Sequence, residues 1–114
     1  MSPVPLLDRA HLDAQTHGDA AFAHELLGLF RGQCRRLLPG ILDGSAEAAD
    51  RADRAHSLRG SALGVGAGQV ARVSAEVEDR LRARTGDAPV AALAATVAAT
   101  LAEIDGTVAS HAVR

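Results

Sequence analysis

The sequence lacks lysine, asparagine, tryptophan and tyrosine, and it contains one cysteine. Without lysine the chain has no P-loop, because that loop places a lysine on the phosphates of its nucleotide. Without asparagine it has no Asn-X-Ser/Thr acceptor for N-linked glycosylation. Cys34 has no second cysteine with which to form a disulfide in the chain. These absences exclude several classes of protein and leave the helix-forming residues and the histidines as the informative features.

Residues that favour β-strands are also scarce. Two phenylalanines are the only aromatic residues of the Phe, Trp and Tyr set, against 25 alanines and 14 leucines among 114 residues. Ala and Leu are strong helix formers, whereas strands favour aromatic and β-branched side chains. A chain of this length buries enough surface for one core without a metal or a disulfide. We therefore predict an all-α protein with one helical domain over residues 1–114, in which residues 1–7 are irregular.

The charge pattern argues against nucleic acid and membrane partners. The formal net charge is −2, every basic residue is arginine, and acidic residues are interspersed among the arginines, so no basic face is evident. No apolar run reaches the length of about 18 residues that a membrane span needs. Asp8 and Asp13 interrupt the N-terminal stretch where a signal peptide would be apolar. We expect a cytoplasmic monomer whose partners are proteins.

Turn and capping residues divide the chain into five expected helices. Asp and Ser favour the first position of a helix, whereas Gly and Pro favour its end. The expected boundaries are Asp8 to Thr16, Ala20 to a kink or end at Pro39-Gly40, the N-cap Ser45 to Val65, Val70 to Thr85-Gly86, and the N-cap Asp87 with Pro89 in the first turn to Val108.

Apolar residues recur in steps of three and four through the four longer segments, which places them on one face of each helix. The expected faces are Phe22, Leu26, Leu29, Phe30, Leu37 and Ile41; Ala48, Ala52, Ala55, Leu58, Ala62 and Val65; Val70, Val73, Val77 and Leu81; and Val90, Leu93, Val97, Leu101, Ile104 and Val108. Four amphipathic helices joined by short loops bury these faces most simply in an antiparallel four-helix bundle, with the short first helix over one end. Cys34 is expected inside as a small hydrophobe.

His56 lies away from the apolar face of its helix. At 100° per residue it points more than about 90° from the centre of that face, so we expect its imidazole in solvent. Arg59 and Gly60 follow at i+3 and i+4, on the same side of the helix. A glycine inside a helix costs about 1 kcal/mol relative to alanine. Because alanine is abundant in this chain, we infer that Gly60 leaves room for another protein to approach His56.

The segment Ala55-His56-Ser57-Leu58-Arg59-Gly60-Ser61-Ala62, followed by Gly66-Ala67, resembles the histidine-containing phosphotransfer (HPt) domain of bacterial multistep phosphorelays. The motif of that family reads approximately Ala-His-x-Leu-Lys-Gly-Ser-Ala and is followed by a Gly-Ala pair. Arg59 stands where the family usually has lysine. Gly18-Asp19, with Glu25-Leu26-Leu27 and Phe30, looks like the second helix of the family, so the resemblance extends from about residue 8 to about residue 110.

The resemblance implies that His56 accepts a phosphoryl group on Nε2 from a receiver-domain aspartate and passes it to another such aspartate. Arg59 would offset the charge of the phosphoryl oxygens, and Gly60, Ser61 and Leu63 would line the surface where the receiver docks. Mg²⁺ is expected in the receiver, whereas the chain itself needs no metal or cofactor. The expected partners are response-regulator receiver domains and a hybrid histidine kinase. The implied role is that of a phosphocarrier without catalytic activity of its own.

Glu78 is a further candidate for the site. It follows the core position Val77, so it is expected on the flank of its helix. In the family that the chain resembles, this place commonly holds a Glu or Gln that reaches the phosphorylatable imidazole. A carboxylate that accepts a hydrogen bond from Nδ1–H leaves Nε2 free to attack. The alternative is a solvated carboxylate paired with Arg82 at i+4.

Other interpretations stay open from the sequence alone. The chain could be a helical adaptor that binds a signalling protein without carrying phosphate. Arg59 could be a solvated charge, and Ser61 could be a small residue that packs within the bundle. The remaining histidines lack the spacing of a metal site and are expected on the solvated surface. They are His11, His17, His24 and His111.

Overall fold

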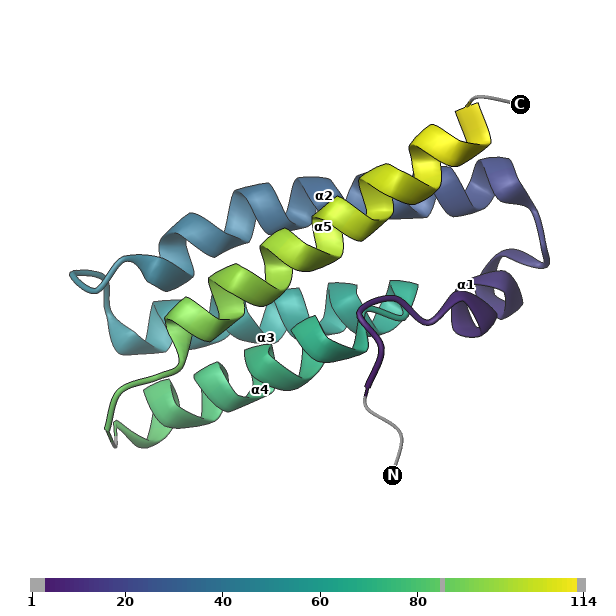
Figure 1. The fold of residues 1–114 in the computed structure, drawn as a ribbon. Helices are drawn as coiled ribbons and strands as arrows, with labels where there is room; N and C mark the ends of the chain where they lie inside the picture. Colours follow the sequence, from purple (N-terminus) through teal and green to yellow (C-terminus); the bar gives the residue numbers. More distant parts are fainter. Residues whose placement is uncertain (1–3, 85, 113–114) are drawn as a thin grey trace.

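The chain folds into five helices, and the four long ones form an antiparallel bundle (Figure 1). The computed structural model describes residues 4–84 and 86–112, with side chains described as far as residue 107. No strand occurs in this part of the chain, so the all-α prediction is confirmed. The helices are α1 (Arg9–Thr16), α2 (Ala20–Leu42), α3 (Ala48–Val65), α4 (Gly68–Ala83) and α5 (Val90–Ala112).

Consecutive long helices run in opposite directions along the bundle (Figure 1). Helix α3 packs against α2 and α4, and α5 closes the bundle by packing against the same two helices. The short α1 contacts α2 and α3 at one end. This arrangement confirms the predicted bundle with a short N-terminal helix, and it places α3 beside α4 along most of their lengths.

Most of the core follows the predicted apolar faces, but the face of α2 is rotated. Its buried residues step by three and four along the helix, and they are Leu27, Phe30, Cys34, Leu37 and Ile41. Phe22 and Leu29 were expected inside, yet they are 41% and 63% exposed. Leu29 stands one residue, or about 100°, from Phe30 at the centre of the buried face, so it lies on the flank of the helix. On this flank Leu29 lines a groove together with residues of α3.

Of the two outcomes predicted at Pro39-Gly40, a kink or an end of the second helix, the end is wrong. Helix α2 continues through Pro39 to Leu42, although proline cannot donate the hydrogen bond that a helix interior requires. Tertiary contacts beyond the proline compensate for that loss. Ile41 is fully buried, and its carbonyl oxygen accepts a hydrogen bond of 2.9 Å from Nε of Arg51 on α3.

Two predicted helix caps are also wrong. Both the amide and the hydroxyl of Ser45 donate to a carboxylate oxygen of Asp43, which holds Ser45 in the loop before α3. Helix α3 begins at Ala48, and its N-cap residue Glu47 makes no side-chain hydrogen bond to the helix. At α5 the carbonyl oxygen of Pro89 accepts the first helical hydrogen bond, from Leu93 at 3.1 Å, so Asp87 lies outside the helix.

Helix α4 ends before the residues at which the sequence predicts its end. Helix α4 ends at Ala83, and Arg84 after it has a left-handed backbone conformation. The expected end at Thr85-Gly86 is therefore late, and Thr85 itself lies outside the described residues. In α5 the residues Leu93, Val97 and Ile104 are buried, while the side chain of Val108 lies outside the described part.

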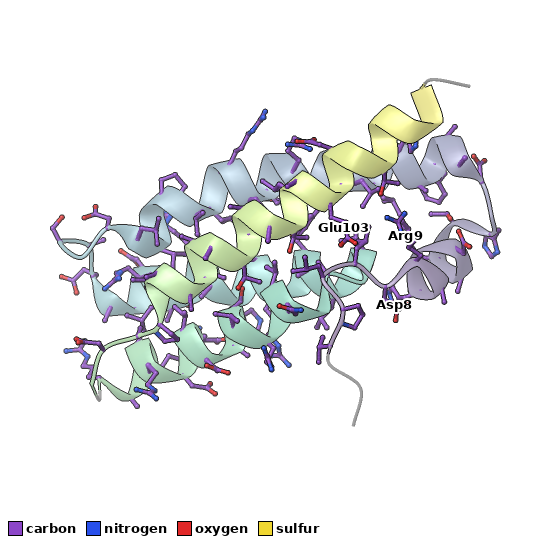
Figure 2. All side chains as sticks on the ribbon, in the orientation of Figure 1. Asp8, Arg9 and Glu103 are labelled. Carbon is purple, nitrogen blue, oxygen red and sulfur yellow. The ribbon has the colours of Figure 1, made fainter. Side chains whose placement is uncertain are left out.

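The N-terminal segment is attached to the turn between α3 and α4. The side chain of Asp8 caps α1 by accepting from the amide of His11 at 3.1 Å. The backbone amide of Asp8 donates to the carbonyl oxygen of Gly66 at 2.8 Å. Arg9 extends from α1 towards α5, where its guanidinium donates to the hydroxyl of Thr107 at 2.7 Å (Figure 2). These bonds hold α1 over the end of the bundle.

Helix α5 contains a segment that is long and apolar enough to cross a membrane by length and composition alone. This segment is Val90–Thr107, so the prediction that no run of the chain reaches the length of a membrane span is wrong by this measure. Its mean hydropathy is 1.3, to which seven alanines contribute. Its larger side chains Leu93, Val97 and Ile104 are buried against the other helices. These side chains form one face that packs in the bundle, and 22% of the segment is buried.

Candidate phosphotransfer site

His56 lies on the exposed side of α3. The neighbouring core positions Ala55 and Leu58 are fully buried and fix the rotation of the helix. The side chain of His56 keeps 64% of its surface exposed, as the helical spacing predicts. The imidazole is therefore accessible from solvent, while the core holds its backbone in place.

Glu78 of α4 lies next to this imidazole. Nδ1 of His56 and Oε1 of Glu78 are 3.2 Å apart. Val77 beside Glu78 is fully buried, and the Glu78 side chain is only 12% exposed. The antiparallel packing of α3 and α4 around the turn at Gly66 brings these two residues together across 22 positions of sequence.

Arg82 holds the other carboxylate oxygen of Glu78. Nε of Arg82 donates to Oε2 at 2.9 Å, and Nη2 donates to a carboxylate oxygen of Asp53 on α3 at 3.0 Å. The sequence presents His56 and Arg82 as alternative partners of Glu78, whereas in the structure Glu78 contacts both with separate oxygens. Asp53 is not predicted from the sequence; its only signal is its position three residues before His56 on the same helix face.

The surroundings of Glu78 keep it ionised. Burial favours the neutral carboxyl group, but the hydrogen bonds from Arg82 and His56 favour the carboxylate and outweigh burial. The pKa of Glu78 consequently lies below its ordinary value of 4.5. Because a carboxylate only accepts hydrogen bonds, Nδ1 of His56 must be the donor in this contact. The lone pair of the neutral ring then lies on Nε2, across the ring from Glu78.

Arg59 and Gly60 accompany His56 on the exposed side of α3. Arg59 is exposed and makes no hydrogen bond or ion pair with any described residue. Gly60 is also exposed, and a Cβ atom added there would meet no other atom within 4 Å. Packing among the described residues therefore requires neither an arginine at position 59 nor a glycine at position 60.

A groove between α2 and α3 adjoins Gly60. Its lining residues are Leu26, Leu29, Phe30, Gln33, Gly60, Ser61, Gly64 and Val65. Ser61 is half-buried, so it contributes to both the groove and the helix packing. Leu63 is 51% exposed but lines a different hollow, with Val4 and Pro5 of the N-terminal segment. The structure thus brings Gly60 and Ser61 together on one surface and places Leu63 on another.

The family model of the Hpt domain matches residues 25–107, which is most of the chain and includes every site residue described above. The chain belongs to the Hpt domain family. No curated protein and no solved structure matched the chain. As an Hpt domain it is a phosphocarrier module with a phosphotransfer role in two-component signalling. Hpt domains interact there with response-regulator receiver domains and histidine kinases.

The Hpt match is shorter than the resemblance suggested. It begins at Glu25 within α2, so α1 and the first turn of α2 lie outside it. The network of Asp53, His56, Glu78 and Arg82 lies wholly inside it. These four candidate residues all lie on α3 and α4.

The other histidines of this Hpt domain differ from one another. His17 is exposed, as predicted. His11 is half-buried against Gly66, and its ring Nε2 is buried without a hydrogen-bond partner in the described chain, so the prediction of a solvated residue is wrong. His24 is half-buried, and the side chain of His111 lies outside the described part. Within the described residues no group of three or more His, Cys, Asp or Glu could hold a metal ion.

Proposed function

We propose that Nε2 of His56 accepts a phosphoryl group from a receiver-domain aspartate and passes it to the aspartate of another receiver. The observation that carries this proposal is the contact between Nδ1 of His56 and Glu78 at 3.2 Å. This contact supports a ring proton on Nδ1, because a carboxylate only accepts, and that tautomer leaves the lone pair on Nε2 for attack. The exposure of the imidazole supports the proposal, because the phosphorus atom must reach Nε2 from a separate protein.

Phosphoryl acceptance forms a bond between Nε2 and phosphorus as the bond between phosphorus and the aspartyl oxygen breaks. The aspartate leaves as a carboxylate with the electron pair of the broken bond. Nδ1 keeps its proton, so the ring becomes positively charged, and the Glu78 carboxylate stabilises this charge. In the second step a carboxylate oxygen of another receiver bonds to the phosphorus as the bond between phosphorus and Nε2 breaks, and the electron pair of the broken bond returns to Nε2, so the ring becomes neutral again. No proton has to leave the ring in either step.

Neutralisation of the phosphoryl charge is the remaining requirement, since phosphoryl transfer depends mainly on positioning and electrostatics. Arg59 follows His56 by three positions on the same side of α3, and it has no partner among the described residues. We propose that its guanidinium contacts the phosphoryl oxygens during transfer. Mg²⁺ is supplied by the receiver domain in this proposal.

Docking of the receiver is assigned to the groove beside Gly60. Leu29 offers exposed apolar surface there, and the missing side chain at Gly60 permits close approach to α3. Apolar contact near the centre of an interface supplies much of its binding energy. We propose that the chain works as a cytoplasmic monomer that binds one receiver at a time.

Transfer of radioactive phosphate tests the proposal. Receiver domains are loaded with labelled phosphate from an acyl phosphate in Mg²⁺ and then mixed with the protein. We expect acid-labile, base-stable label on the wild type and none on His56→Gln, with unchanged helicity because the side chain is largely exposed. His17→Asn is the matched control, since it removes an exposed histidine at a left-handed position that Asn tolerates. Label that persists on His56→Gln, or binding of receivers without any label, would support a different site or an adaptor.

A further inference from the structure

Four side chains form a chain of polar contacts between α3 and α4. Asp53 and His56 are three positions apart on α3, and Glu78 and Arg82 are four apart on α4, so each pair shares one helix face. The antiparallel direction of the helices places Asp53 opposite Arg82 and His56 opposite Glu78. The contact distances along this chain are 3.0 Å from Arg82 to Asp53, 2.9 Å from Arg82 to Glu78, and 3.2 Å from Glu78 to His56.

Arg82 contacts two carboxylates with two different nitrogens of one planar group. Nε bonds to Glu78 on its own helix, and Nη2 bonds to Asp53 on the neighbouring helix. The fixed geometry of the guanidinium makes these two directions dependent on each other, which a lysine ammonium would not do. Since Oε2 of Glu78 is occupied by Arg82, Oε1 is the oxygen that is turned towards Nδ1 of His56.

We infer that Arg82, anchored by Asp53, is a positioning residue that orients Glu78 and thereby selects the Nδ1–H tautomer of His56. This inference rests on the proposed function, in which Nε2 is the nucleophile. Arg82 acts through Glu78, since among the described residues its side chain contacts Glu78 and Asp53 and not the imidazole.

The exposure of Arg82 and Asp53 argues against a role limited to folding stability. The Arg82 side chain is 45% exposed and that of Asp53 is 70% exposed. Ion pairs with this exposure contribute little to folding, because solvent screens them. Glu78, by contrast, is largely buried, so the direction of its carboxylate is sensitive to the partner at its second oxygen. The geometry therefore points to orientation of Glu78 as the main effect of the pair.

The first measurement reads the tautomer directly. Nitrogen-15 NMR of the purified protein, at a pH where His56 is neutral, reports which ring nitrogen carries the proton. We expect the Nδ1–H form to dominate in the wild type and to lose that dominance in Arg82→Ala and, to a smaller extent, in Asp53→Ala. Arg80→Ala is the matched control, because Arg80 lies about 200° around α4 from Glu78 and faces away from His56 and Glu78.

The second measurement is chemical phosphorylation with phosphoramidate, a small donor that transfers its phosphoryl group to an imidazole nitrogen and releases ammonia. No receiver is needed, so docking cannot affect the result. We expect Arg82→Ala to slow labelling of His56 by about 3- to 10-fold, the change that corresponds to the net free energy of one hydrogen bond. In a Glu78→Ala background, the same substitution should have no further effect, because the carboxylate through which Arg82 acts is absent.

The two readouts separate this inference from the proposed function. An unchanged tautomer in Arg82→Ala, an unchanged or faster labelling rate, or an equal loss in the Glu78→Ala background would each overturn the positioning role. The tautomer measurement needs no phosphorylation at all. The positioning role can therefore stand even if receivers fail to phosphorylate His56, and it can fail while His56 remains the acceptor.

Discussion

Gly60 and Gly66 stand close together at the C-terminal end of α3, yet a side chain would meet opposite surroundings at the two positions. A Cβ atom added at Gly60 would have no neighbour within 4 Å. One added at Gly66 would lie 2.9 Å from the carbonyl oxygen of Asp8, and the backbone there has a left-handed φ of 80°. Gly66 is therefore required by the fold, whereas Gly60 is not.

Gly66→Ala should destabilise the protein. A left-handed conformation costs an ordinary residue about 1–2 kcal/mol, and the added methyl group would also push Asp8 away from the turn. We expect a lower free energy of unfolding in urea and faster proteolysis of the N-terminal segment. If unfolding and proteolysis both match the wild type, the attachment of α1 to the α3–α4 turn contributes nothing measurable.

Gly60 should respond in the opposite way. Gly60→Ala is expected to raise the free energy of unfolding by up to about 1 kcal/mol, since alanine is the better helix former and has space there. Gly60→Gln should fold equally well but weaken receiver binding by about tenfold, because its side chain fills the groove where a central contact is expected. Gly32→Gln is the control: Gly32 is an exposed glycine of α2 with open space around it, outside the groove. Calorimetric titration with a receiver measures the affinity of both glutamine variants. Equal affinities of Gly60→Gln and Gly32→Gln would contradict the docking assignment.

Cys34 should be unreactive in the native protein. It is almost fully buried in α2, and burial raises the pKa of its thiol to about 11, although the nearby Arg31 opposes the shift. Thiolate is the reactive form, so almost none is present at neutral pH. We expect Ellman's reagent to label the native protein only at the rate of unfolding and to label it at once in urea. Rapid labelling in native buffer would show that the packing around Cys34 opens locally.

The fold was predictable because the helix signal is local. Leu58, Val77 and their neighbours recur at helical spacing, and the structure buries them as that spacing requires. The errors occur where non-local contacts compete with local preference. Pro39 remains inside α2 because Ile41 is buried beyond it, and Ser45 is held by Asp43 in the loop.

The candidate site was predictable in part for a similar reason. Exposure of His56 follows from its own helix, and the family resemblance suggested Glu78. The contact of Arg82 with Asp53 depends on the register of α3 against α4, which packing of the whole bundle sets. Spacing along the chain carries no information about that register, so Asp53 could not be identified from the sequence.

Glu78 should make the protein sensitive to acid in a defined pH range. Its pKa in the folded state lies below the ordinary value of 4.5: burial would raise it, but the hydrogen bonds of Arg82 and His56 outweigh burial. A group whose pKa is lowered by folding stabilises the native state above its unfolded pKa, and this stabilisation is lost as the pH falls through the folded pKa.

In Glu78→Gln that contribution is missing at every pH. We therefore expect the difference in unfolding free energy between wild type and Glu78→Gln to shrink progressively as the pH falls below about 4.5. Urea titrations at several pH values measure it, with Glu76→Gln, which removes an exposed carboxylate of the same helix, as the control. A difference that stays constant down to pH 3 would mean that Arg82 and His56 do not stabilise the Glu78 carboxylate in the folded protein.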